Sequence, residues 1–135
     1  MNTELLSPVP SAQFLASAML AVLFLQSGLD KVVDFGGNLA WLQGHFSKTP
    51  LRGQVKAMLL TITVGEVLAG ALAAIGAVQL ATSGGTDFAR YGAQASAACI
   101  VLLFAGQRIA KDYAGAATLV PYFGLAAGTI LLTTL

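Results

Sequence analysis

Charged residues are scarce in this chain. Asp, Glu, Lys and Arg together make up 10% of its 135 residues, whereas an ordinary soluble domain carries about a quarter charged residues. Hydrophobic residues make up 56%, and the mean hydropathy is +0.77. Such a chain cannot cover itself with a hydrated surface. The scarcity of charge argues against a soluble domain and predicts that lipid is the solvent.

The chain also lacks an excess of charge of one sign. Its net charge is +1, and its basic residues form no run or stripe. A nucleic-acid-binding surface needs clustered Lys and Arg. We therefore exclude nucleic acid as a partner and expect membrane lipids instead.

Cysteine and histidine each occur once, as Cys99 and His45. A lone cysteine excludes an intramolecular disulfide, a Cys-x-x-Cys redox pair and a structural zinc site. A lone histidine cannot supply the two imidazoles that hold a bis-histidine haem. We expect no metal or prosthetic group of the chain's own, so electrons for any redox reaction would come from a partner or a bound molecule.

Four apolar runs are long enough to cross the bilayer as helices. The first could instead be a signal peptide, but no Lys or Arg precedes it and it is long enough to span. We predict an all-α, integral membrane four-helix bundle that forms a single transmembrane domain over residues 1–135. The expected helices lie at about 11–29, 51–82, 88–110 and 116–134.

Prolines and capping residues suggest where the helices begin. Ser11 follows two prolines and suits an N-cap after an extended entry. Thr49 followed by Pro50 predicts a second helix that begins near Leu51. Pro121 is expected either in the first turn of the last helix or at a kink.

The first connection contains a pattern of its own over residues 38–47. Leu39, Leu42 and Phe46 recur at helical spacing, and Trp41 lies beside them. Trp favours the membrane–water interface. The pattern predicts a short helix that lies in the interface.

Small residues predict where helices approach closely. Gly65, Ala69, Ala73 and Ala77 share one face of the second helix, and Gly124 and Gly128 are four apart on the last. The alternative is chance, because Ala and Gly are abundant throughout the chain.

Lys and Arg are distributed unevenly between the two membrane sides. The first and third connections carry Lys31, Lys48, Arg52, Lys56, Arg108 and Lys111, and the opposite side carries Arg90. By the positive-inside rule, both connections are expected in the cytoplasm and both termini outside.

Two segments that close odd-numbered helices resemble each other. Residues 28–37 and 106–115 both follow the order Gly, five residues, Asp, aromatic, small, Gly. The echo predicts a tandem two-helix repeat. The alternative is a coincidence between two similar helix ends.

Polar residues near these ends are candidates for a ligand-binding pocket. Glu66 lies deep in the second apolar run, where a charge costs at least about 2.5 kcal/mol and is usually paired, protonated or functional. The candidate ligand-binding residues are Gln26, Asp30, Lys31, His45, Glu66, Arg108, Lys111, Asp112 and Tyr113. We expect Arg108 to pair with Asp30 or Glu66. The alternatives are a structural salt-bridge network and, for His45, an ordinary solvated side chain in place of a hydrogen bond to a quinone oxygen.

The segments 24–31, 37–46 and 106–115, together with Glu66, resemble the DoxX/DoxD-like family of small four-helix bacterial membrane proteins. The resemblance spans nearly the whole chain. One departure is at 11–13, where many relatives carry an Arg and this chain has Ser-Ala-Gln. Any role of that Arg is therefore in doubt here.

The resemblance implies an accessory membrane subunit of a quinone- or thiol-linked redox assembly in the bacterial plasma membrane, with redox proteins as partners and a quinone or lipid as the bound molecule. No self-contained catalytic motif is present. Two other functions stay open: a purely structural subunit of a larger complex, and a small proton-coupled carrier.

Overall fold

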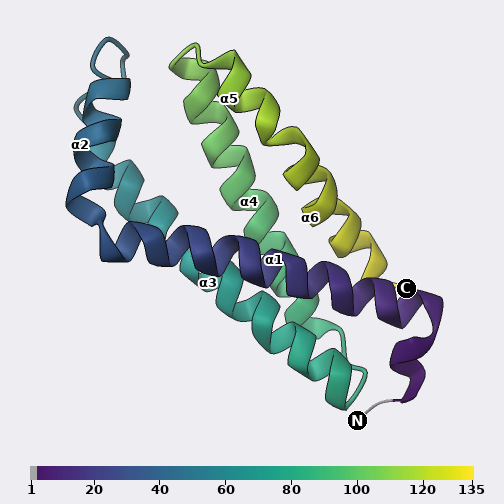
Figure 1. Ribbon diagram of the computed structural model, residues 1–135. Coiled ribbons are helices and arrows are strands. Elements are labelled where there is room, and N and C mark those ends of the chain that lie inside the picture. Colours follow the sequence, from purple (N-terminus) through teal and green to yellow (C-terminus); the bar gives the residue numbers. More distant parts are fainter. Residues whose placement is uncertain (1–2) are drawn as a thin grey trace.

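The computed structural model describes residues 3–135, and all of the regular structure among them is helical (Figure 1). A short 3-10 turn, η1 (Thr3–Leu6), precedes the helices α1 (Pro8–Val33), α2 (Phe35–His45), α3 (Val55–Thr82), α4 (Asp87–Ile109), α5 (Tyr113–Thr118) and α6 (Val120–Leu132). Four segments are long and apolar enough to cross a membrane: α1, α3, α4, and α5 together with α6. The chain is therefore a multi-pass membrane protein.

The long helices pack in a fixed order. α1 lies along α3, α3 lies along α4, and α4 lies along α6, whereas α1 touches α4 and α6 over shorter stretches. α2 and α5 lie at the same end of the molecule (Figure 1). We call this the basic end, because its residues include Lys31, Lys48, Arg52, Lys56, Arg108 and Lys111.

The predicted small-residue contact on α3 is confirmed. Ala69 and Ala73 are fully buried, and a Cβ added to Gly92 of α4 would lie 2.6 Å from the backbone N of Ala73. Only small residues allow backbones to come this close.

The prediction for α6 is wrong within this chain. A Cβ added to Gly124 or Gly128 would meet no atom within 4 Å. The buried face of α6 instead carries Ala126 and Thr129. Ala126 lies two residues after Gly124, which is about 200° around the helix, so Gly124 faces outward.

The first helix begins earlier than expected, at Pro8 instead of residue 11. Pro8 and Pro10 both fall in the first turn, where a backbone N–H has no intrahelical partner to lose. Ser11 is accordingly inside the helix, and its Oγ donates to the carbonyl of Pro8 at 3.0 Å.

The second spanning helix begins later than expected, at Val55. Residues 46–54 form a series of turns. Thr49 does act as a cap, because its Oγ1 accepts a hydrogen bond from the N–H of Leu51 at 3.2 Å. That bond closes a turn and does not start a helix, which shows that the Thr-Pro signal is local.

The last spanning segment is broken at Leu119 into α5 and α6. Pro121 falls in the first turn of α6. It has no N–H to donate to the residue four positions earlier, so a continuous helix would lose a hydrogen bond there. The segment begins at Tyr113, three residues before the expected start at 116.

The short helix expected at 38–47 occupies Phe35–His45, and its start matches that of α5. Asp34 accepts a hydrogen bond from the N–H of Gly37 at 3.3 Å, and Asp112 accepts one from the N–H of Gly115 at 2.9 Å. In both echoing segments an Asp therefore caps a short helix that follows a long one. Asp34 follows α1 directly, whereas Ala110 and Lys111 separate α4 from Asp112.

Candidate ligand-binding site

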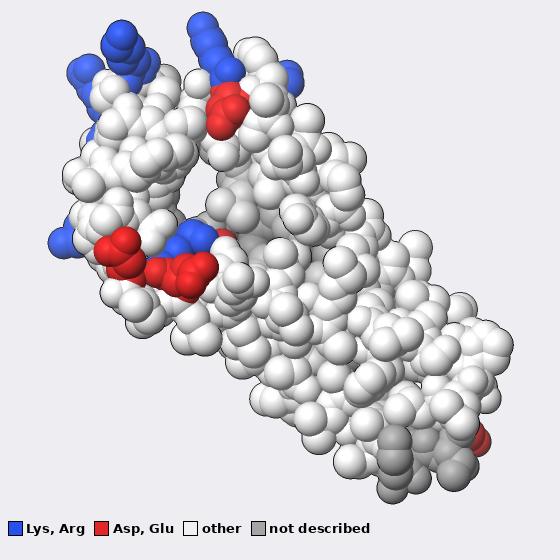
Figure 2. Space-filling view, in the orientation of Figure 1, with Lys and Arg blue, Asp and Glu red and all other residues white. Residues whose placement is uncertain are grey.

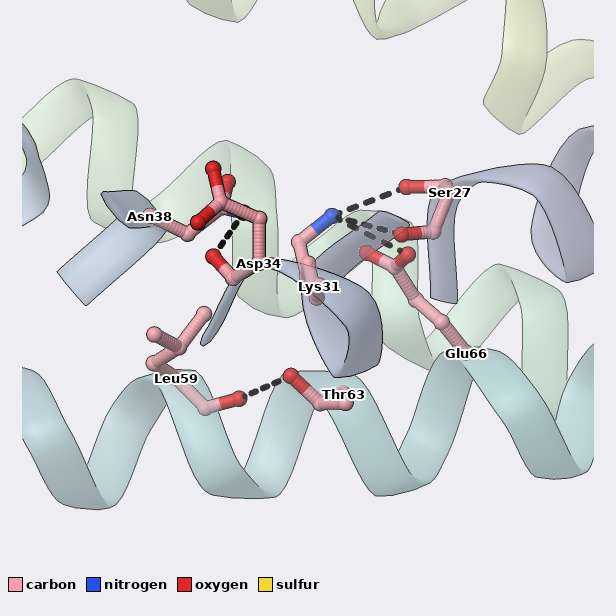
Figure 3. A network of polar contacts seen from close by, with 7 residues as sticks. All are labelled: Ser27, Lys31, Asp34, Asn38, Leu59, Thr63 and Glu66. Carbon is pink, nitrogen blue, oxygen red and sulfur yellow. Dashed lines mark hydrogen bonds and ion pairs between the residues drawn. The ribbon is translucent and has the colours of Figure 1, made fainter. Parts of the chain in front are cut away.

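A buried ion pair joins α1 to α3. The Nζ of Lys31 lies 3.2 Å from Oε2 of Glu66 and donates to Oγ of Ser27 at 2.8 Å (Figure 3). Glu66 is 1% exposed. Its second oxygen, Oε1, is buried and has no hydrogen-bond partner among the residues that the structure describes.

The close approach of the two helices places these groups together. A Cβ added to Gly28 would lie 3.0 Å from the backbone N of Val67, the residue after Glu66. Lys31 follows Gly28 by three residues on α1 and is 19% exposed, so it reaches inward from the helix end. Because removing both charges from water is costly, the net stability of such a pair is small, but losing one partner strands the other.

A second polar group joins α2 to the end of α4. The Nε2 of His45 lies 3.0 Å from Oε1 of Gln107 and 3.8 Å from Oδ2 of Asp112. The ring of Trp41 stacks on His45 with centroids 4.8 Å apart, and Phe46 meets His45 edge-on. The last turn of α2 is thus anchored to the α4–α5 junction.

A cavity of about 550 Å³ lies between α2, α3 and α4 at the basic end. Its walls are mainly apolar and include Leu42, Phe46, Leu59 and Leu103. The side chains of Gln54, Thr61 and Gln107 also line it. Figure 2 shows an opening in the surface between the α2 side and the α4–α5 side, with acidic and basic side chains along one edge.

The structure brings six of the nine predicted site residues into contact with one another, as the separate pairs Lys31–Glu66, His45–Asp112 and Arg108–Tyr113. Gln26, Asp30 and Lys111 are exposed.

Arg108 does not pair with Asp30 or Glu66 as expected. Its guanidinium lies over the ring of Tyr113 at 4.5 Å from the centroid, and both residues are exposed. Both α1 and α4 lie along α3, but Lys31 is the cation that reaches inward to Glu66, whereas the side chain of Arg108 is exposed.

Two residues of the site were not predicted from the sequence, namely Gln107 and Ser27. Both are uncharged, so the sequence did not mark either as a buried or paired group. Gln107 did belong to the echoing segment, and a polar amide at the end of an apolar run was the available signal. No sequence pattern pointed to the cavity, because its apolar walls look like any lipid-facing surface.

The candidate site consists of the cavity, the Lys31–Glu66 pair and the contacts of His45. Within residues 3–135, no three His, Cys, Asp or Glu side chains lie together as metal ligands would. No family model matches the sequence, and no curated protein or solved structure matches it either. The cavity and the two polar groups beside it are the features of this chain that bear on its function.

Proposed function

We propose that this chain is a membrane subunit that holds a quinone or another small lipophilic molecule for a redox assembly. The observation that carries the proposal is the cavity of about 550 Å³ between α2, α3 and α4. Its apolar walls with a few polar groups are typical of ligand sites. A lipophilic ligand would enter from the bilayer, and its polar head would remain near Gln107 and His45.

The resemblance to the DoxX/DoxD-like family supports this role. Under the proposal the four spans form a bundle of two related halves, and the matching Asp34 and Asp112 junctions are consistent with a tandem repeat. The protein would reside in a bacterial plasma membrane with its basic end in the cytoplasm. Redox proteins at that face would supply or take up the electrons.

The proposal is tested by filling the cavity. Gly106 lines it, and a Cβ there would have only the Phe46 ring nearby, at 3.7 Å. We expect Gly106→Leu to reduce the quinone or lipid that co-purifies in mild detergent, measured by solvent extraction and mass spectrometry. The matched control is Gly124→Leu on the outward face of α6, which should retain the bound molecule.

Equal loss in both variants, or no lipophilic molecule in the unmodified protein, would contradict the proposal. If partner proteins co-purified in that second case, the chain would be a purely structural subunit.

A second function, a small proton-coupled carrier, is favoured by one observation. Glu66 is an almost fully buried acid with an unpartnered Oε1, and intramembrane acids of this kind relay protons in transporters. The carrier predicts proton uptake by proteoliposomes that is abolished by Glu66→Gln. The binding subunit predicts no flux in either protein.

The orientation can be tested with introduced cysteines, because Cys99 is buried and gives little background. Lys48→Cys lies in the exposed turns at the basic end, and Ser83→Cys is exposed at the opposite end. In intact cells an impermeant thiol reagent should label Ser83→Cys and spare Lys48→Cys. Reversed labelling would place the basic end outside.

A further inference from the structure

Two polar side chains lie near the Nε2 of His45. Its Nε2 lies 3.0 Å from Oε1 of Gln107 and 3.8 Å from Oδ2 of Asp112. A carboxylate can only accept a hydrogen bond, whereas an amide presents either an acceptor oxygen or a donor nitrogen. The amide meets this nitrogen with its oxygen, an arrangement in which Nε2 carries the hydrogen and donates it to Oε1 of Gln107. The carboxylate of Asp112 lies beyond hydrogen-bond distance of the ring.

The reversed amide would be unfavourable. With hydrogen on Nε2 of His45, the amide N–H group would face that hydrogen, donor against donor. The contact therefore couples the tautomer of His45 to the orientation of the Gln107 amide, because a hydrogen on Nε2 requires the amide oxygen to face the ring. With Oε1 occupied, the amide N–H groups are what Gln107 can offer to a molecule in the cavity that it lines.

The other polar residues that line the cavity are less suited to this task. The hydroxyl of Thr61 donates to the carbonyl of Ala57 at 2.9 Å, so its hydrogen is already used. Gln54 is exposed in the turn before α3, where water competes for its amide. Gln107 is half-buried and held by His45, so its donor is both oriented and sheltered.

We propose that Gln107 determines specificity by donating a hydrogen bond to a carbonyl oxygen on the head of a lipophilic ligand, and that His45 is the positioning residue that orients this amide. The ligand class is an apolar molecule with a carbonyl acceptor: a quinone in its oxidised form, or the ester group of a membrane lipid. The inference rests on the proposed function and adds a preference for an acceptor head group.

Trp41 provides the readout. It is the only tryptophan of the chain and stacks on His45, so a quinone bound beside Gln107 should quench its fluorescence. The probe is a decyl-substituted benzoquinone added to the delipidated protein in detergent. The comparison ligand is the corresponding hydroquinone under anaerobic, reducing conditions, measured by competition.

Three variants separate specificity from structure. Gln107→Glu keeps the shape but replaces the donor with an acceptor-only carboxylate, so quinone binding should weaken about tenfold, the factor that corresponds to roughly 1.4 kcal/mol. Hydroquinone binding should weaken less, because its hydroxyls can donate to the carboxylate. Gln107→Met should also weaken quinone binding, but it should not shift the preference toward hydroquinone, because methionine offers no carboxylate to accept from the hydroxyls. Gln43→Glu, on the exposed face of α2, is the charge-matched control and should change nothing.

His45→Phe tests the positioning role, because it keeps an aromatic ring beside Trp41 but removes the N–H that orients the amide. Quinone affinity should fall by a smaller factor than in Gln107→Glu. The ratio of quinone affinity to hydroquinone affinity should also decrease. An unchanged ligand preference in His45→Phe would remove the positioning role.

The source of the carbonyl is decided by competition. If phosphatidylglycerol vesicles displace the quinone, and the displacement also weakens in Gln107→Glu, the natural occupant is a lipid ester. If they do not, it is a quinone.

Saturable quinone binding that is indifferent to Gln107→Glu and Gln107→Met would overturn this inference and leave the proposed function standing. Absence of saturable binding of either the quinone or the lipid by the unmodified protein would overturn both.

Discussion

The contact between α3 and α4 differs between the basic end and the rest of the two helices. Away from the basic end, a Cβ added to Gly76 or Gly92 would lie 2.3 or 2.6 Å from the backbone of the neighbouring helix. At the basic end, a Cβ added to Gly106 would meet only the Phe46 ring, at 3.7 Å. The first two glycines hold helices in contact, whereas Gly106 borders the cavity.

The difference has a physical cause. Helices in lipid have no hydrophobic drive to associate, so close packing of small residues brings them together. At the basic end, α3 and α4 present larger side chains to the gap between them, including Leu59, Met58 and Leu103. These side chains hold the backbones apart, and α2 covers the space through a few side-chain contacts. The contact between α3 and α4 is therefore close where the glycines lie and open at the cavity.

The largest effect is expected at the Lys31–Glu66 pair, which joins α1 to α3. Lys31→Met strands a buried acid and should cost about 3 to 5 kcal/mol. Adding Glu66→Met should recover most of this loss, because no unpaired charge then remains. Thermal unfolding in mild detergent can be followed by the reaction of a thiol dye with Cys99, which is buried in the folded protein. A double variant as unstable as the sum of the two single losses would show that the pair is not coupled.

The second-largest effect is expected at the close contact between α3 and α4. Gly76→Ala places a Cβ against the backbone of Ala89 and should cost about 1 to 3 kcal/mol through overpacking. Gly128→Ala, where a Cβ meets no atom within 4 Å, is the control. The same thiol assay applies. Equal melting temperatures for the two variants would mean that α3 and α4 do not depend on this contact.

A smaller effect is expected at the α4–α5 junction, at the basic end. Asp112→Ala removes the cap on Gly115 and should cost about 1 kcal/mol. Asp112→Asn keeps an acceptor for that N–H and should lose less. If the two variants have the same melting temperature, the charge of Asp112 near His45 contributes more to stability than its hydrogen bond to Gly115.

The smallest effect has the opposite sign. Gly106→Ala lies in a helix with room for a methyl group and should stabilise the protein by about 0.5 to 1 kcal/mol, since alanine favours the helix more than glycine does. The same substitution at Gly76 is expected to destabilise. Loss of stability in both variants would mean that the basic end is as tightly packed as the rest.

Much of the fold was predictable because its signals are local or compositional. Scarce charge and long apolar runs indicated four spans. The sequence also repeats the spacing of Asp34 and Gly37 at Asp112 and Gly115, and in the structure each of these Asp residues caps a short helix. The helix starts were displaced by a few residues where proline signals admitted more than one position, as at Pro8.

The candidate site was less predictable. Helical periodicity determines which residues share a face, but it does not determine which neighbour that face meets. The depth of Glu66 followed from the sequence, whereas the identity of its partner depended on the rotation of α1 against α3, which brought Lys31 and not Arg108 to it. Arg108 stacks on Tyr113 instead.

The sequence by itself determined that four segments are long and apolar enough to cross a membrane, that Glu66 lies deep in one of them, and that residues 28–37 and 106–115 follow the same order. Only the tertiary structure decided that α6 turns Gly124 outward and that His45 reaches Gln107. It also decided that larger side chains leave a cavity between α2, α3 and α4. The physical reason is that composition and local hydrogen bonds act within one helix, whereas the rotation and separation of helices depend on which side chains meet between them.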